Sequence, residues 1–300
     1  MTNYTLNSQY YLIIENGNIK DSQLPVGVTY NQDILTFSTH DSIEIQVIFL
    51  LNNYQQTITY QFEKHVVVDI IETRILDQQS SLHKTMNLDE NATVHIFHEN
   101  NSINNETVSC FDDVNIKRDA TIQSAYAELS DGSCQCVYRY YLDGENAEAK
   151  IRMAILSKQK ENKTYEVLIQ HNQPHTYGQM DNYGVVKEQG KLVIDGIGTI
   201  TKGQHGSSSH QTNKIMVFDP ECIASANPYL YIDEFDVKAS HAAGVGKMDE
   251  EHLYYLQSRG LTKKQAMQLI TYGYLKPVIE VVDNPMLKEQ FENVLSKVGA

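Results

Sequence analysis

Short apolar runs alternate with polar, turn-forming residues along the first 235 residues of the chain. In SIEIQVIFLL (42–51), apolar residues occupy every second position, which is the period of a strand with one buried face. A helical period of 3.6 residues is not evident in this region, so alternating strands and crossover helices are excluded. The pattern predicts strands at 42–51, 65–73, 93–97, 114–116, 136–142, 151–156, 165–169, 191–194 and 214–218.

A short motif recurs between these strands. Asn91-Ala92, Asp119-Ala120 and Asn146-Ala147 each place a polar turn former and a small residue before a strand, and they begin 28 and 27 residues apart. Such a period is typical of one coil of a parallel β-solenoid, because each coil stacks on the one before. Glu221-Cys222 is interpreted as a later copy of the same motif.

An antiparallel sandwich of short strands is the main alternative to a solenoid. Asp131-Gly132, Asp143-Gly144 and Asp195-Gly196 have the composition of hairpin turns. Periodicity alone leaves both architectures open.

The C-terminal part carries helix signals. Asp249 is expected to cap a helix that Gly260 ends, Thr262 and Gln265 form a capping box for a second helix, and Asn284-Pro285 opens a third. These helices are short and amphipathic, so they must pack on the β-structure, on each other or on a partner.

We therefore divide the chain into two predicted domains. Residues 1–248 form a mainly β core with a short N-terminal β segment, and residues 249–300 form a small helical domain.

Composition narrows the class of protein. The chain has 38 acidic and 24 basic residues and a net charge of -14, which argues against a nucleic-acid-binding protein. It contains no apolar run long enough for a membrane span, and its first residues do not resemble a secretory signal. We expect a cytoplasmic protein that binds neither nucleic acid nor membrane.

Most candidate chemistry is weak at the sequence level. Cys134 and Cys136 share one face of a strand and are interpreted as ordinary strand cysteines. His171 and His175 lack the HExxH context of a zinc site. Gly244 and Gly246 lie near a predicted helix start, but a single GxG is weak evidence for an anion-binding site. We therefore assign no catalytic residues and no metal ligands.

His241 is the one candidate functional residue. We place it in a glycine-containing turn, within Val237–Gly260, where the last strand passes into the first helix. Its neighbours are small, which allows close approach of a partner chain or a cluster. An imidazole can ligate iron or relay protons, but these residues alone favour a buried histidine that is bonded to the backbone.

The same stretch resembles the SufB/SufD family of iron–sulfur cluster assembly proteins, and is most similar to SufD. The family pattern Val-Lys-Cys-Ser-His-Gly-Ala-Thr-Val-Gly is matched by VKASHAAGVG (237–246), and Tyr-Leu-x-Ser/Ala-Arg-Gly by YLQSRG (255–260). NPYLYI (227–232) is similar to the step before that motif. The resemblance covers roughly residues 85 to 300.

The resemblance implies a fold and a role. It implies a right-handed parallel β-helix followed by a small helical domain, in a non-enzymatic scaffold subunit. The β-helix would pair with a SufB-like subunit or with a second copy, His241 would lie at that interface, and any iron–sulfur cluster would be transient and held by the complex. The C-terminal helices would dock the ATPase SufC, through residues that include Leu253, Tyr254, Leu256, Arg259, Met267 and Ile270.

Two departures from the family pattern keep other functions open. Ala239 replaces the family's cysteine, which removes a thiolate ligand at that position, and the family's helical N-terminal domain has no counterpart because β-runs begin near Tyr10. A paralogous interaction module without cluster chemistry is one alternative. A β-solenoid carbohydrate lyase or hydrolase, suggested by acidic residues at the turns, is another.

Overall fold

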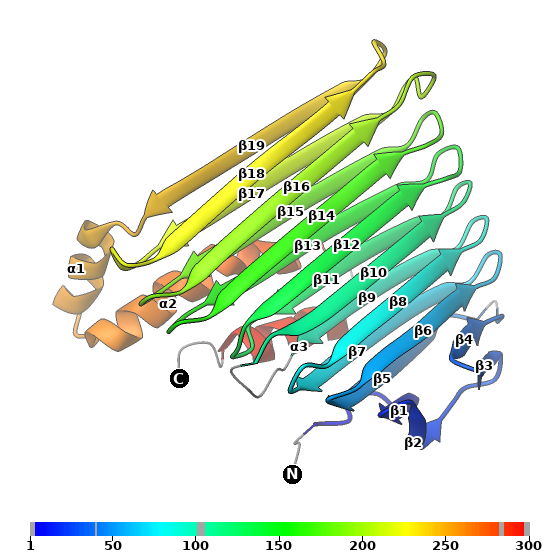
Figure 1. Cartoon of the computed structure of the whole chain (residues 1–300), viewed down its shortest axis with the longest axis horizontal. Helices are drawn as coiled ribbons and strands as arrows, with labels where there is room; N and C mark the ends of the chain where they lie inside the picture. The colour runs from blue at the N-terminus through cyan, green and yellow to red at the C-terminus, as the bar shows by residue number, and fades with distance from the viewer. Residues whose placement is uncertain (1–3, 40, 101–105, 282–284, 297–300) are drawn as a thin grey trace.

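The strands stack into a two-walled parallel β-solenoid, and the helices lie along one wall (Figure 1). The computed structural model describes residues 4–39, 41–100, 106–281 and 285–296. The first wall is a sheet in the order β19 (Lys238–Lys247), β17 (Ser208–Val217), β15 (Tyr177–Val186), β13 (Glu148–Ser157), β11 (Thr121–Glu128), β9 (Thr93–Asn100), β7 (Val67–Asp77), β5 (Ile43–Asn52), β1 (Tyr11–Glu15), β2 (Asn18–Gln23). The second wall has the order β18 (Ile223–Ile232), β16 (Lys191–Ile200), β14 (Asn162–His171), β12 (Cys134–Leu142), β10 (Val108–Ile116), β8 (Ser81–Leu88), β6 (Gln55–Phe62), β4 (Ile34–Phe37), β3 (Val28–Asn31).

The predicted solenoid is confirmed and the antiparallel sandwich is wrong. Among the described strands, only β1 with β2 and β3 with β4 pair antiparallel. Gly132 and Gly144 lie in turns that carry the chain from one wall to the other, and Asp195-Gly196 lies inside β16. The Asp-Gly pairs therefore do not close hairpins.

The recurring motif has a clear physical basis. Asn91, Asp119 and Asn146 have positive φ values of 59°, 57° and 59°, a conformation that Asn and Asp tolerate better than most residues. The alanine that follows each of them is fully buried beneath the next coil. Turn chemistry and close packing together explain why this pair of residues repeats.

The fourth proposed copy of the motif is wrong. Glu221-Cys222 lies in the turn between β17 and β18, at the opposite edge of the solenoid from the other three copies. The series instead continues with His175-Thr176 and Gly206-Ser207, which have positive φ at the first residue and a buried second residue. Their composition differs from Asn-Ala, so sequence similarity alone missed them.

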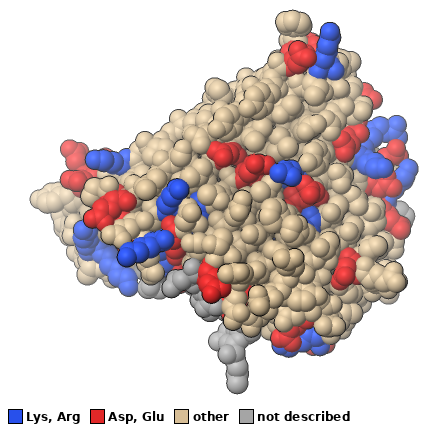
Figure 2. Space-filling model, in the orientation of Figure 1, with Lys and Arg blue, Asp and Glu red and all other residues tan. Residues whose placement is uncertain are grey.

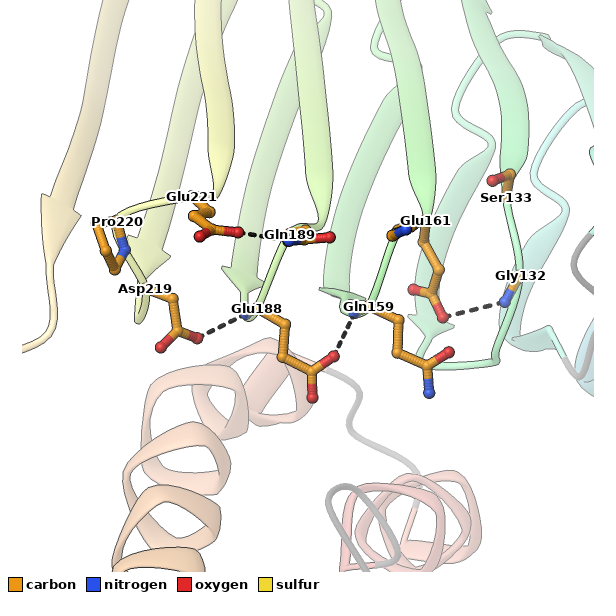
Figure 3. Close-up of a pocket in the computed structure, with 10 residues that line it drawn as sticks. Gly132, Ser133, Gln159, Glu161, Glu188, Gln189, Asp219, Pro220 and Glu221 are labelled. Carbon is orange, nitrogen blue, oxygen red and sulfur yellow. Dashed lines mark hydrogen bonds between the residues drawn. The ribbon is translucent and has the colours of Figure 1, made fainter.

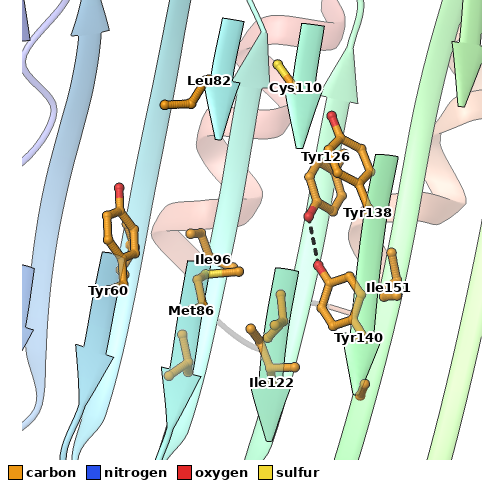
Figure 4. Close-up of a cluster of buried hydrophobic side chains, with 14 of the residues drawn as sticks. Tyr60, Leu82, Met86, Ile96, Cys110, Ile122, Tyr126, Tyr138, Tyr140 and Ile151 are labelled. Atoms are coloured by element: carbon orange, nitrogen blue, oxygen red, sulfur yellow. Dashed lines mark hydrogen bonds between the residues drawn. The ribbon is translucent and has the colours of Figure 1, made fainter. Parts of the chain in front are cut away.

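Inward-facing side chains of both walls form the main core. Figure 4 shows part of it, where Tyr126 and Tyr140 meet hydroxyl to hydroxyl at 2.7 Å among aliphatic neighbours. Alternate residues of each strand contribute to this core, as expected for period-two patterning.

The core of the early coils also encloses a cluster of charged side chains. Glu72, Arg74, Lys84, His98 and Asp112 are all buried, with Glu72 Oε1 2.6 Å from Arg74 Nε and Arg74 Nη2 2.7 Å from Asp112 Oδ2. Lys84 Nζ lies 2.8 Å from Glu72 Oε1. Burial alone would raise the pKa of Glu72, but the Lys84 and Arg74 cations hold that pKa well below its usual range.

The C-terminal segment contains α1 (Glu250–Ser258), α2 (Lys263–Leu275), the 3₁₀-helix η1 (Lys276–Val281) and α3 (Pro285–Ser296). The caps predicted at Asp249 and at Thr262 with Gln265 are confirmed. Asn284 lies outside the described residues.

Most of these helices pack on the first wall. Leu287, Phe291 and Leu295 of α3 are buried in a second apolar cluster, where Phe291 meets Phe97 of β9 edge to face at 5.9 Å. The helix α1 differs, because it has no buried residue. The boundary at residue 248 stays a prediction, since α2, η1 and α3 share a core with the solenoid wall.

The two ends of the solenoid are built differently. Towards the N-terminus each wall finishes in an antiparallel pair, β1–β2 or β3–β4, whereas towards the C-terminus the walls finish in the single parallel strands β19 and β18. Short hairpins are a common way to terminate a sheet edge, and long unpaired parallel strands are not. Across the described part of the chain, no helix is long and apolar enough to cross a membrane.

Candidate functional site

We call the region formed by β18, β19 and the turn between them (residues 223–247) the open end. Each of the two strands pairs with one neighbour, β16 or β17, among the described residues. Large apolar side chains are exposed here. Tyr231 has 59% of its surface accessible to solvent, Phe235 is fully exposed, and Ile223 and Val245 are also exposed. An exposed edge with exposed apolar side chains is typical of a protein interaction surface.

His241 lies in the middle of β19, so the prediction that it occupies a turn is wrong. Gly244 and Gly246 belong to the same ten-residue strand, and α1 begins only at Glu250. The small residues that suggested a turn form a flat strand whose outer edge is exposed. The weak anion cradle expected at these glycines is therefore absent from this strand.

The strand register fixes where the His241 side chain points. His241 pairs with Gln211 of β17, and Ala239 pairs with Ser209. Gln211 and Ser209 are buried inside the solenoid, and side chains in register stand on the same face of a sheet. His241 therefore continues the inward-facing column into the last coil, where it is exposed because no further coil covers it.

The interior below His241 is polar. The Gln211 amide donates to the Tyr229 carbonyl of β18 at 2.9 Å, and the Asn182 amide donates to Asn213 Oδ1 at 2.8 Å. Gly196 of β16 gives these amides room, because a Cβ there would lie 2.6 Å from Asn213 Nδ2. The apolar core of the earlier coils thus gives way to amides next to the open end.

Thiolate ligands are not brought to this site. Ala239 stands where the family pattern has cysteine, and Cys110, Cys134 and Cys136 are buried in β10 and β12, several coils away. Cys222 directly precedes β18, at the end of that strand opposite to the turn that leads to β19 and His241. Burial raises the pKa of the Cys136 thiol, as do its Cys110 and Cys134 neighbours. Over the residues that the structure describes, no three His, Cys, Asp or Glu side chains are arranged to hold a metal ion.

His171 and His175, the histidine pair noted in the sequence, occupy different parts of the fold. His171 is buried at the end of β14 with its Nδ1 2.7 Å from Thr176 Oγ1, and burial lowers its pKa to about 4. His175 occupies a turn beside His205, with ring centroids 5.0 Å apart. His171 and His175 therefore do not point to a common ligand.

The acidic turns form the candidate site for a carbohydrate enzyme. A groove of about 860 Å³ runs along four successive turns and is lined by Glu161, Glu188, Asp219 and Glu221 among others (Figure 3). Neighbouring carboxylates of this kind motivated the enzyme alternative.

Three carboxylates of this groove accept hydrogen bonds from backbone N–H groups, and the fourth, Glu221, accepts from the side-chain amide of Gln189. Asp219 accepts the N–H of Glu188 at 2.6 Å, and the Glu188 carboxylate accepts the N–H of Gln159 at 2.7 Å (Figure 3). Glu161 accepts from Lys158 and from Gly132. Asp219, Glu188 and Glu161 thus cap turns of their own or the preceding coil, so a structural role accounts for these three carboxylates.

The predicted docking residues of the helices fall into two groups. Tyr254 and Arg259 of α1 are exposed, and Tyr254 has 75% of its surface accessible. Leu253 and Met267 line a groove of about 340 Å³ between α1, α2 and the solenoid, and Leu256 and Ile270 are half-buried. Figure 2 shows charged side chains around these helices and at the turns, and a short, mostly acidic row across the middle of the face it presents.

Sequence reasoning missed the buried charged cluster, although a signal for it exists. In β7, Val68 and Ile70 face inward, so Glu72 and Arg74 at the next two alternate positions must face inward as well. Charged residues at the inward-facing alternate positions of a strand are therefore the sequence signal for this cluster.

Together these features define a parallel β-solenoid protein with an open C-terminal end and one projecting helix. Residues 51–274 match the family model described as SUF system FeS cluster assembly, SufBD core domain. The chain therefore belongs to the SufB/SufD family of iron–sulfur cluster assembly proteins.

The chain is also similar to curated proteins that are named as iron–sulfur cluster assembly proteins. The chain is 32% identical to the iron-sulfur cluster assembly protein SufD of Bacillus subtilis over 182 residues, which are 60% of this chain and 41% of the relative. It is 27% identical to SufD of Escherichia coli over 158 residues, 53% of this chain and 37% of the relative. The matched segments thus span about two fifths of these relatives.

Proposed function

We propose that this protein is a non-enzymatic, SufD-like scaffold subunit of an ATPase-coupled iron–sulfur cluster assembly complex in the cytoplasm. Its open end pairs with a SufB-like subunit, and its helix α1 docks a SufC-type ATPase. The observation that carries the proposal is the open end itself: two ten-residue edge strands and exposed apolar side chains in a chain of this family.

His241 acts at the interface with the SufB-like subunit. Its side chain faces the interior of the last coil and is exposed until a partner covers that coil. An imidazole at this place can ligate iron or move a proton once the interface has closed. The cluster is cargo of the complex, because Ala239 replaces the family's cysteine two residues before His241 and no group of three metal-ligating side chains occurs among the described residues.

The ATPase docks on a smaller helical surface than amphipathicity suggested. The apolar face of α3 is buried against the solenoid wall, as are Ala266 and Leu275 of α2. Helix α1 buries no residue and exposes Tyr254 and Tyr255, so we place the main ATPase contact there, although α2 also exposes Leu269.

Co-expression with candidate SufB-like and SufC-like proteins tests the proposal. We expect a three-component complex to co-purify and to carry iron when assembled with a sulfur source. Failure of the chain to co-purify with either candidate would refute the scaffold role. Activity on an acidic polysaccharide that is lost on Glu188→Gln would favour the carbohydrate enzyme instead.

A further inference from the structure

A continuous row of buried polar side chains lies directly beneath His241. Strand β17 places Ser209, Gln211 and Asn213 on its inner face, Ser207 precedes them in the turn, and all four are at most 3% exposed. We propose that this polar row holds bound water molecules, which carry protons between the turn at Ser207 and His241. The proposal rests on the proposed function, because it specifies how His241 exchanges protons after a partner has covered it.

Three buried amide atoms around the polar row have no hydrogen-bond partner within the described part of the chain. They are Asn182 Oδ1, Gln211 Oε1 and Asn213 Nδ2. The bonds that these amides do make use other atoms, since Gln211 Nε2 donates to the Tyr229 carbonyl and Asn182 Nδ2 donates to Asn213 Oδ1. Two acceptors and one donor are therefore left over, and in protein interiors such atoms are usually bonded to ordered water.

His171 adds another acceptor at the turn end of the polar row. The Thr176 hydroxyl donates to the Gln173 carbonyl at 3.1 Å, so Thr176 Oγ1 accepts from His171 Nδ1–H at 2.7 Å. The second ring nitrogen, Nε2, is then an unprotonated acceptor, and it is buried without a partner among the described residues. The Thr176 and Ser207 hydroxyls lie 2.9 Å apart, so hydrogen bonds connect this imidazole to a turn in which Gln173 is exposed.

Glycines leave space beside these polar atoms. Gly198 faces inward on β16, at the register position where β12 carries Tyr140. A Cβ at Gly198 would lie 2.9 Å from Ser209 Oγ, and a Cβ at Gly178 would lie 2.8 Å from His171 Nε2. Both polar atoms thus face backbone that carries no side chain, which a small molecule can approach closely.

The chemistry of the polar row identifies the ligand as water. The row presents hydroxyls, amides and an imidazole, so donors and acceptors are mixed and no charged side chain belongs to it. An ion would need charges or several donors of one kind, whereas water can both donate and accept at each position.

His241 lies at the open side of the polar row. It pairs in register with Gln211, on a strand about 4.8 Å away, and both side chains stand on the inner face. Once a partner covers this coil, the polar row provides a route from His241 to the exposed turn at Gln173. In each transfer a water accepts one proton and releases another, so His241 gains or loses one proton and the solvent loses or gains one.

An apolar side chain of similar size tests the proton route. We expect Gln211→Leu to slow iron loading of the complex with SufB-like and SufC-like subunits about tenfold or more, and to raise the solvent deuterium isotope effect on that rate. Gln56→Leu is the matched control, because Gln56 is 2% exposed on the inner face of β6 and its Oε1 also has no partner among the described residues. Gln56→Leu should leave the rate and the isotope effect unchanged, and melting curves check that both variants fold.

A high-resolution crystal structure of the chain tests for the water directly. We expect ordered waters within hydrogen-bond distance of Asn182 Oδ1, Asn213 Nδ2 and His171 Nε2. An interior without water at these atoms overturns the proposal and leaves the scaffold role untouched.

The outcomes separate this inference from the proposed function. If Gln211→Leu matches Gln56→Leu in rate and isotope effect, the proton role is overturned and the scaffold role stands. If the wild-type chain binds no SufB-like subunit, the proposed function and the proton role both fail, and the crystal structure alone decides whether the polar row binds water.

Discussion

His241 and Gln211 are register partners on β19 and β17, yet one side chain is exposed and the other is 3% exposed. They occupy the same inward-facing column in successive coils. The difference arises because the solenoid adds no coil after β19. His241 thus occupies an inward-facing position on which no following coil packs. This is the structural reason for placing it at an interface.

Replacing this histidine should separate assembly from folding. We expect His241→Ala to change the free energy of unfolding by less than about 0.5 kcal/mol, as is usual for exposed side chains, and to lower iron loading of the reconstituted complex. His210→Ala is the matched control, since His210 lies on the outer face of the adjacent strand, next to Ser240. Equal iron loading in both variants would assign His241 a structural role.

The helix α3 should behave as part of the solenoid fold. Phe291→Ala removes a buried ring that packs on Phe97, so we expect a loss of about 3–5 kcal/mol in the free energy of unfolding, measured by urea denaturation. Tyr254→Ser on α1 is the control and should cost little. A small effect of Phe291→Ala would show that α3 does not share the solenoid core.

Stability should fall as the pH is lowered from 7 towards 4. Burial, followed by the Lys84 cation, lowers the pKa of His98 to about 3, and burial lowers the pKa of His171 to about 4. In the unfolded chain both histidines take up protons near pH 6.5, so acidification below that value favours unfolding. A His171→Gln variant should show a shallower decline of melting temperature between pH 7 and pH 4, and an unchanged decline would contradict the burial of a neutral His171.

Period-two patterning and the Asn-Ala motif predicted a solenoid but left an antiparallel sandwich open, and the resemblance of residues 237–260 to the SufB/SufD family favoured the solenoid. The burial of Glu72 and Arg74 could also have been predicted, because both occupy inward-facing alternate positions of β7. The position of His241 was harder to predict, since Gly244 and Gly246 suggest a turn when only local propensity is considered.

In the structure, pairing with β17 keeps this segment extended, and that long-range contact leaves no local signal. The surface against which each amphipathic helix packs could not be predicted from the sequence either. An amphipathic pattern such as that of α3 predicts burial but not whether the burying surface belongs to the same chain or to a partner.

The central claim is that one chain holds two different partners on two separate surfaces. Native mass spectrometry of the chain co-expressed with SufB-like and SufC-like proteins tests it most directly, using two paired variants. Tyr231→Ser with Phe235→Ser alters the open end, and Tyr254→Ser with Tyr255→Ser alters α1; all four side chains are exposed, so folding should be unaffected.

We expect the first variant to lose the SufB-like subunit while keeping the ATPase on α1, and the second to lose the ATPase alone. Each loss should amount to about tenfold or more in affinity, as for exposed aromatic anchors at interfaces. Retention of both partners by both variants, or loss of both partners from either one, would contradict the account.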